Sequence, residues 1–192
     1  MTHFFIPAAM SVLSLCLASS AFAGELEASD NVKKAEYSDS HFSDDPQYDN
    51  VEYDAETQLS IVSMILGGGF DRVSEQLKIC FAHGGGAFAF LLGRLENAWH
   101  FRDIARGKSQ FPPSHYLDRF YLDTAVFDHD SLDLLVKKMT TKKLMFGTDY
   151  PFPLGEQKMG QLIKTSSTLT PMEQQQLLAS NAEQFFNLPI SV

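Results

Sequence analysis

Cysteine and basic residues are scarce in this chain of 192 residues, and each scarcity excludes a class of protein. Only Cys16 and Cys80 are present, so the disulfide framework that holds many small secreted domains together is excluded. Lysine and arginine number 15 against 24 acidic residues. Nucleic acid is not expected as a partner, because binding to the phosphate backbone requires clustered basic side chains. With 44% hydrophobic and 20% charged residues, the composition is typical of an acidic globular protein.

An apolar run opens the chain and resembles a secretory signal. It extends from about Phe4 to Leu17 and is followed by Ala21-Phe22-Ala23, an A-x-A cleavage pattern. We therefore predict a signal-peptide-like leader at residues 1–23, too short to span a membrane comfortably, and no membrane contact after its removal. Its first residues contain neither lysine nor arginine, so a mis-assigned start and an apolar tail without function remain alternatives.

The next segment, residues 24–54, lacks a sustained apolar period. From Glu25 to Asp54 it holds ten acidic residues against Lys33 and Lys34. This composition predicts a disordered, solvated linker or tail. Residues 55–192 then form the predicted folded unit.

Strand and helix patterns alternate after residue 55. Three short apolar runs predict strands at residues 78–82, 119–125 and 142–149. Helical patterns occupy about 55–77, 93–107, 128–141, 158–167 and 171–186, with Asp128 or Asp130 as one cap and Pro171 at a first helical position. This order predicts an α/β fold with a parallel sheet. Three βα units are too few for a closed barrel of roughly 250 residues but could form its last part.

Ionisable side chains follow each predicted strand. His83, Asp123 and Asp149 come at or just after the three strand ends. Because functional groups in parallel α/β folds gather at the carboxyl ends of strands, we expect these side chains at one rim. A histidine with an aspartate there could form a metal site or a general base. A helix cap or a loop hydrogen-bonding role is the alternative for each, and for Asp123 it is at least as good.

Three glycines and an arginine follow His83. Gly84-Gly85-Gly86 allows the backbone to approach a ligand or a neighbouring loop closely. A nucleotide site is disfavoured, because the chain has no G-x-G-x-x-G at this point. Arg94 lies in apolar surroundings, where an arginine usually has an anionic partner in the protein or in a substrate.

The stretches HGGGAFAFLLGR, FYLDTAVFDHDSL and LMFGTDYPFPLGE together resemble the aminocarboxymuconate-semialdehyde decarboxylases, of amidohydrolase-2 type within the amidohydrolase superfamily. The resemblance covers about residues 55–189, the carboxy-terminal part of that family. It implies a distorted (β/α)8 TIM-type barrel, one zinc ion and a homodimer. The implied reaction removes carbon dioxide non-oxidatively from 2-amino-3-carboxymuconate 6-semialdehyde in the kynurenine pathway of tryptophan catabolism.

The resemblance also implies roles for individual residues. Asp149 matches a metal-binding aspartate, and His83 matches the histidine that takes a proton from zinc-bound water. Arg94 matches an arginine that crosses a dimer interface to hold a substrate carboxylate in the neighbouring subunit. The chemistry is consistent, since zinc lowers the pKa of bound water to about 7 and an imidazole can accept that proton.

The chain also departs from the family. It has no H-x-H pair and no histidine matching the family's further metal ligand, and a second substrate-binding arginine is absent. A catalytic zinc normally takes three protein ligands, so we expect poor zinc binding by a truncated barrel. A gene remnant, a wrongly joined gene and a fusion are the hypotheses for this. The leader indicates export and the family's reaction is cytosolic, so localisation stays open.

Two other functions remain open. One is another amidohydrolase-2 type decarboxylase or hydrolase, acting on an aromatic acid such as a resorcylate. The other is a non-catalytic barrel remnant or an exported interaction protein. Among neighbouring residues, Phe88, Phe90, Leu91 and Leu92 are interpreted as core or dimer-interface packing, the loop 150–153 as positioning Asp149, and Glu156 as a capping or surface carboxylate.

Overall fold

A computed structural model describes residues 49–153 and 155–188. The predicted leader, and the acidic segment as far as residue 48, lie outside the described residues. Helix α2 (Asp49–Leu66) includes six residues that the sequence pattern assigns to the acidic segment. Residues 49–54 are therefore helical, and the prediction of a disordered segment is wrong for these six residues.

Three short parallel strands form the sheet. They are β1 (Cys80–Phe81), β2 (Tyr121–Asp123) and β3 (Leu144–Met145), hydrogen-bonded in that order. Cys80 pairs with Tyr121, and Leu122 pairs with Leu144. The predicted parallel α/β arrangement is confirmed, although each strand is shorter than its apolar run.

Helical segments connect and follow the strands. Between β1 and β2 lie η2 (His83–Gly85), α4 (Phe88–Phe101), α5 (Asp103–Arg106) and η3 (Pro113–Arg119), and α2 is followed by α3 (Gly69–Arg72). Between β2 and β3 lie α6 (His129–Met139) and η4 (Thr141–Lys143). After β3 come α7 (Gln161–Lys164), α8 (Pro171–Gln175), the π-helical η5 (Gln176–Ser180) and α9 (Asn181–Phe186). Helix α4 begins five residues before the predicted start at Gly93, because the alanines and leucines that precede Gly93 are strong helix formers.

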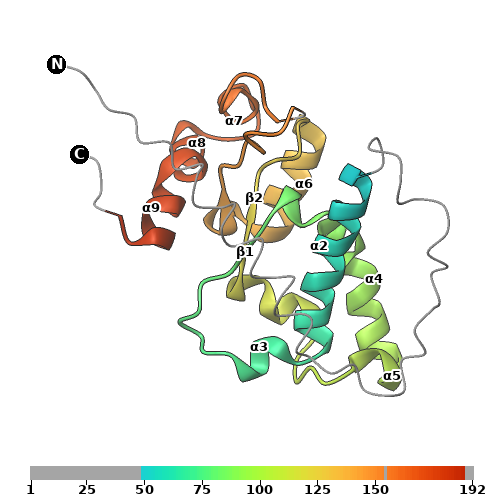
Figure 1. Ribbon diagram of the computed structural model, residues 1–192. Helices are drawn as coiled ribbons and strands as arrows, with labels where there is room; N and C mark the ends of the chain where they lie inside the picture. The colour runs from blue at the N-terminus through green and yellow to red at the C-terminus, as the bar shows by residue number, and fades with distance from the viewer. Residues whose placement is uncertain (1–48, 154, 189–192) are drawn as a thin grey trace.

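Helices cover both faces of the sheet (Figure 1). Successive residues of a strand point to opposite faces, and the two clusters of buried side chains follow this rule. Phe81, Leu122 and Leu144 belong to the larger cluster, with side chains of α2, α4 and α6. Cys80 and Met145 face the other way and pack with Phe185 of α9. A parallel sheet needs such cover on both sides. Among the described helices, none is long and apolar enough to cross a membrane.

Candidate functional site

His83 and Asp149 lie together at the carboxyl end of the sheet. His83 comes two residues after β1, and Asp149 comes four residues after β3. The distance from His83 Nε2 to Asp149 Oδ1 is 3.4 Å, and their side chains are 29% and 18% exposed. Both residues have left-handed backbone, with φ of 54° and 60°. The two strand ends thus bring an imidazole and a carboxylate into contact while leaving both open to solvent.

Asp123, the third residue at the rim, is buried beside them at the end of β2. Its Oδ1 accepts hydrogen bonds from the backbone N–H groups of Gly84 at 2.9 Å and Ala125 at 3.1 Å. Burial raises the pKa of this carboxyl, and the two hydrogen bonds and His83 oppose the increase. Asp123 therefore joins the turn after β1 to the end of β2, which is the hydrogen-bonding role weighed as its alternative.

Two glycines let the strand ends approach one another. Gly84 has φ of 59°, and a Cβ atom there would lie 2.5 Å from Cγ1 of Val126. A Cβ atom on Gly147 would lie 2.8 Å from Cβ of Asp123. In both places a larger residue would force the rim apart. The glycines after His83 thus serve close approach to a neighbouring segment, one of the two roles predicted for them.

The segment that carries Asp149 is tied back to the protein. The N–H of Glu156 donates to the carbonyl oxygen of Thr148 at 2.8 Å. The Glu156 carboxylate accepts from the N–H groups of Gly160 at 2.7 Å and Leu162 at 2.8 Å, at the start of α7. Glu156 is therefore the capping carboxylate, one of its two predicted roles. These contacts fix both sides of the loop that contains Asp149.

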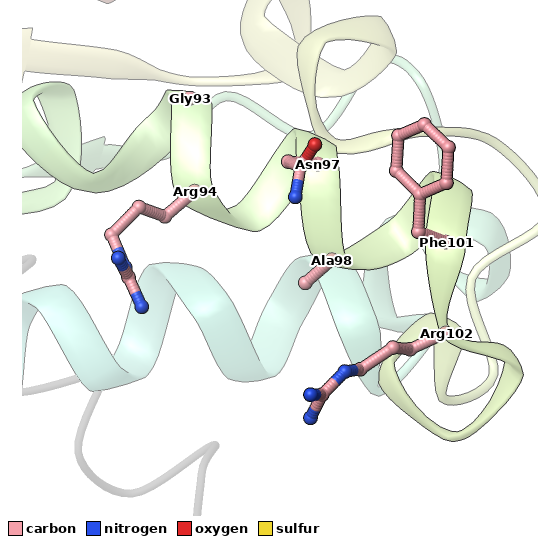
Figure 2. Close-up of a pocket in the computed structure, with 6 residues that line it drawn as sticks. All are labelled: Gly93, Arg94, Asn97, Ala98, Phe101 and Arg102. Carbon is pink, nitrogen blue, oxygen red and sulfur yellow. The ribbon is translucent and has the colours of Figure 1, made fainter.

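Arg94 lies away from this pair, on the exposed side of α4. It is six residues beyond the start of the helix, about 9 Å along the axis. Figure 2 shows Arg94 extending from α4, with Asn97 and Ala98 further along the helix and Arg102 just after its end. These residues, with Gly93 and Phe101, line an open cavity of about 430 Å³. Sequence reasoning singled out Arg94 and missed Arg102, although the eight-residue spacing puts both near one side of a helix.

His83 and Asp149 do not complete a metal site within the described part of the chain. A catalytic zinc takes three protein ligands, and no group of three or more histidine, cysteine or acidic side chains in residues 49–153 and 155–188 could hold a metal ion. The described pair can hold and transfer a proton between imidazole and carboxylate. Further metal ligands would have to come from outside the described residues.

A parallel sheet with a histidine and an aspartate at its carboxyl rim is the arrangement found in α/β enzymes with a barrel or an open sheet. Comparison with known proteins identifies the family within this class. The sequence profile of the Amidohydrolase family matches residues 22–188, and the chain belongs to that family. Structural neighbours in this family are TIM-type barrels, and the described part of this chain is a small parallel sheet with helices around it.

Several proteins to which this chain is similar are named as decarboxylases. The 2-amino-3-carboxymuconate-6-semialdehyde decarboxylase of Dictyostelium discoideum is 44% identical over 135 residues, which cover 70% of this chain and 37% of that protein. The structure of 5-carboxyvanillate decarboxylase from Sphingomonas paucimobilis is 28% identical with a TM-score of 0.59, over 71% of this chain and 41% of that one. A dihydroxybenzoic acid decarboxylase from Polaromonas, solved with bound manganese, has the same fold at 21% identity and a TM-score of 0.62, over 72% and 42%. The chain therefore spans well under half the length of each of these proteins.

Proposed function

We propose that this chain supplies the carboxy-terminal part of a non-oxidative decarboxylase acting on 2-amino-3-carboxymuconate 6-semialdehyde. The contact between His83 Nε2 and Asp149 Oδ1 at 3.4 Å carries the proposal, because it joins the two side chains that the family's chemistry requires at this rim. The 44% identity with the decarboxylase of that name supports the substrate.

Each site residue has a distinct task in this proposal. His83 transfers the proton that replaces the departing carbon dioxide, since an imidazole can gain and lose a proton near neutral pH. Arg94 binds a substrate carboxylate, for which a guanidinium fork is suited. Its position on an exposed helix side fits delivery to the site of a second copy in a homodimer. Asp149 is the proposed zinc ligand, and the remaining ligands would come from outside the described residues.

The test is loss of the semialdehyde chromophore in the presence of the purified full chain and zinc. His83→Asn should lower the rate by about 10²–10⁴-fold, the usual contribution of general acid–base catalysis. His100→Asn is the matched control, because His100 lies on α4 and contacts Glu96 at 3.3 Å. Equal loss in both variants, or none in either, would contradict the role of His83. Activity on 5-carboxyvanillate or a resorcylate and not on the semialdehyde would assign an aromatic acid as substrate instead.

A non-catalytic role is the second candidate. The observation that favours it is the absence, within the described residues, of a group of three side chains able to hold a metal. Metal analysis of the folded full chain separates the two candidates. Near-stoichiometric zinc with measurable turnover supports the decarboxylase, and a folded chain with neither supports a barrel remnant or an interaction protein.

A further inference from the structure

One side of α4 presents aromatic and cationic side chains to solvent. Phe90 and Phe101 are 75% and 80% exposed, and Arg94 lies between them. The spacing of these residues is four and then seven, which puts them on a single helix face. We call this surface, together with Asn97 and Arg102, the α4 face. Large aromatic side chains so exposed, next to arginines, are typical of a binding surface.

The two arginines of the α4 face have no anionic partner within the described residues, where neither forms a salt bridge or a hydrogen bond. Several other basic side chains of the described part do have partners. Arg106 pairs with Asp103 at 3.3 Å, and Lys78 donates to a carbonyl oxygen at the carboxyl end of α9. Arg119 donates to the carbonyl oxygens of Phe70 and Val73, and the ammonium group of Lys143 lies over the ring of Tyr121. The α4 face therefore offers two guanidinium groups that are unpaired within the described part of the chain, beside an open cavity of about 430 Å³.

We propose that the acidic segment of this same chain, residues 25–48, docks on the α4 face. The segment contains seven acidic residues against two lysines and also carries Tyr37, Phe42 and Tyr48. Its carboxylates complement Arg94 and Arg102, and its aromatic side chains complement Phe90 and Phe101. The proposed occupant thus matches the α4 face in both charge and apolar character.

Length and attachment favour this occupant. Arg94 lies seven residues before Phe101, the last residue of α4, which is about 10 Å along the helix, and Arg102 follows Phe101 directly. Asp39 and Asp44 are five residues apart, at most about 18 Å in an extended chain, so the two carboxylates can reach both guanidinium groups. The segment leads directly into α2, which lies beside α4 (Figure 1). A short tether of this kind gives an effective concentration of about a millimolar, so even a weak contact would be occupied.

Docking would regulate the site proposed above. Arg94 cannot hold a substrate carboxylate in a second copy while it pairs with the acidic segment of its own chain. The acidic segment would therefore compete with dimer formation through the α4 face. This consequence rests on the proposed function, whereas the docking itself does not.

Paramagnetic broadening in the full chain tests the docking without any activity assay. A nitroxide is attached at Ser43→Cys in a chain that also carries Cys16→Ser, and Cys80 is buried. Amide signals of residues 90–102 should lose intensity, whereas those of α8 and α9 should not. Raising the ionic strength to about 1 M, where the Debye length is about 3 Å, should restore the signals.

The matched controls remove the same charge from two places. Arg94→Gln with Arg102→Gln should abolish the broadening, while Lys137→Gln with Lys138→Gln on α6 should leave it unchanged.

A second experiment identifies the occupant by mixing two forms of the chain, one with the nitroxide but without ¹⁵N and one with ¹⁵N but without the nitroxide. Broadening in that mixture would assign the α4 face to a second copy and overturn the proposal, as would the absence of broadening in the singly labelled chain. Neither result would bear on the His83 assay.

Discussion

Gly147 shows how a single missing side chain holds the rim together. Asp123 fills the space that a side chain at position 147 would need, because its Cβ and Oδ2 would lie 2.8 Å and 2.9 Å from a Cβ atom on that residue. Gly147→Ala should therefore destabilise the protein by about 1–3 kcal/mol, the usual cost of overpacking. It should also displace Asp149, two residues further along the chain. The measurement is the midpoint of urea unfolding.

Gly93→Ala is the control for this prediction. No atom lies within 4 Å of a Cβ atom built on Gly93, which is inside α4. Alanine there should stabilise the protein by roughly 0.5–1 kcal/mol, because glycine is the poorer helix former. If the two variants unfolded at the same denaturant concentration, crowding at Gly147 would not be the cause.

The first turn of α6 depends on one carboxylate. Asp128 is the N-cap residue, and its Oδ1 accepts from the N–H of Ser131 at 3.0 Å. Hydrogen bonding from Ser131 holds the pKa of Asp128 below its ordinary value. The folded pKa is thus depressed, so the stabilisation is fully present above the unfolded pKa of about 3.9 and is lost as pH falls through the lower folded pKa.

Asp128→Ala should cost about 1 kcal/mol at neutral pH, the typical value of an N-cap. The difference from the unmodified protein should shrink when pH is lowered below about 4. Asp130→Ala is the matched control, since Asp130 lies in the same first turn without capping it. Thermal unfolding followed by circular dichroism from pH 7 to pH 3 measures both, and an equal loss for the two variants would show that only the helix dipole is involved.

Sequence pattern predicted these elements unevenly. It predicted α6 together with Asp128 and Asp130 as its possible caps. It also predicted that His83 and Asp149 lie at one rim, because parallel strands end at the same edge of a sheet. It placed the start of α4 too late, since the glycines that precede it concealed a run of helix formers. It did not indicate that Arg94 and Arg102 share a cavity, because residue spacing on a helix does not reveal which neighbouring elements leave that side open.

At the scale of the whole molecule, the carboxy-terminal helices complete the fold by covering one face of the sheet. Phe185 packs edge-to-face against Tyr121 at 5.1 Å and against Phe186 at 4.9 Å. Lys78 Nζ donates to the carbonyl oxygens of Gln184 and Phe185, both at 2.8 Å. The periodicity of residues 171–186 predicted an apolar helix face, but periodicity alone cannot identify the surface that this face contacts.

Phe185→Ala should therefore destabilise the whole chain by about 3–5 kcal/mol, the range for truncating a buried phenylalanine. That is a large share of the roughly 5–15 kcal/mol that stabilises a typical domain. Phe90→Ala, at a position that is 75% exposed, should leave stability nearly unchanged. Chemical denaturation compares the two, and similar midpoints would mean that α9 contributes little to the fold.

The left-handed backbone at His83 and Asp149 has a consequence for laboratory evolution. With φ of 54° and 60°, each position costs a non-glycine residue roughly 1–2 kcal/mol, and glycine relieves that cost. In a library selected only for resistance to heating, variants with glycine at positions 83 and 149 would thus gain stability. The most heat-resistant variants would therefore lack the imidazole and the carboxylate that transfer a proton. Screens on this scaffold need a chemical readout in every round.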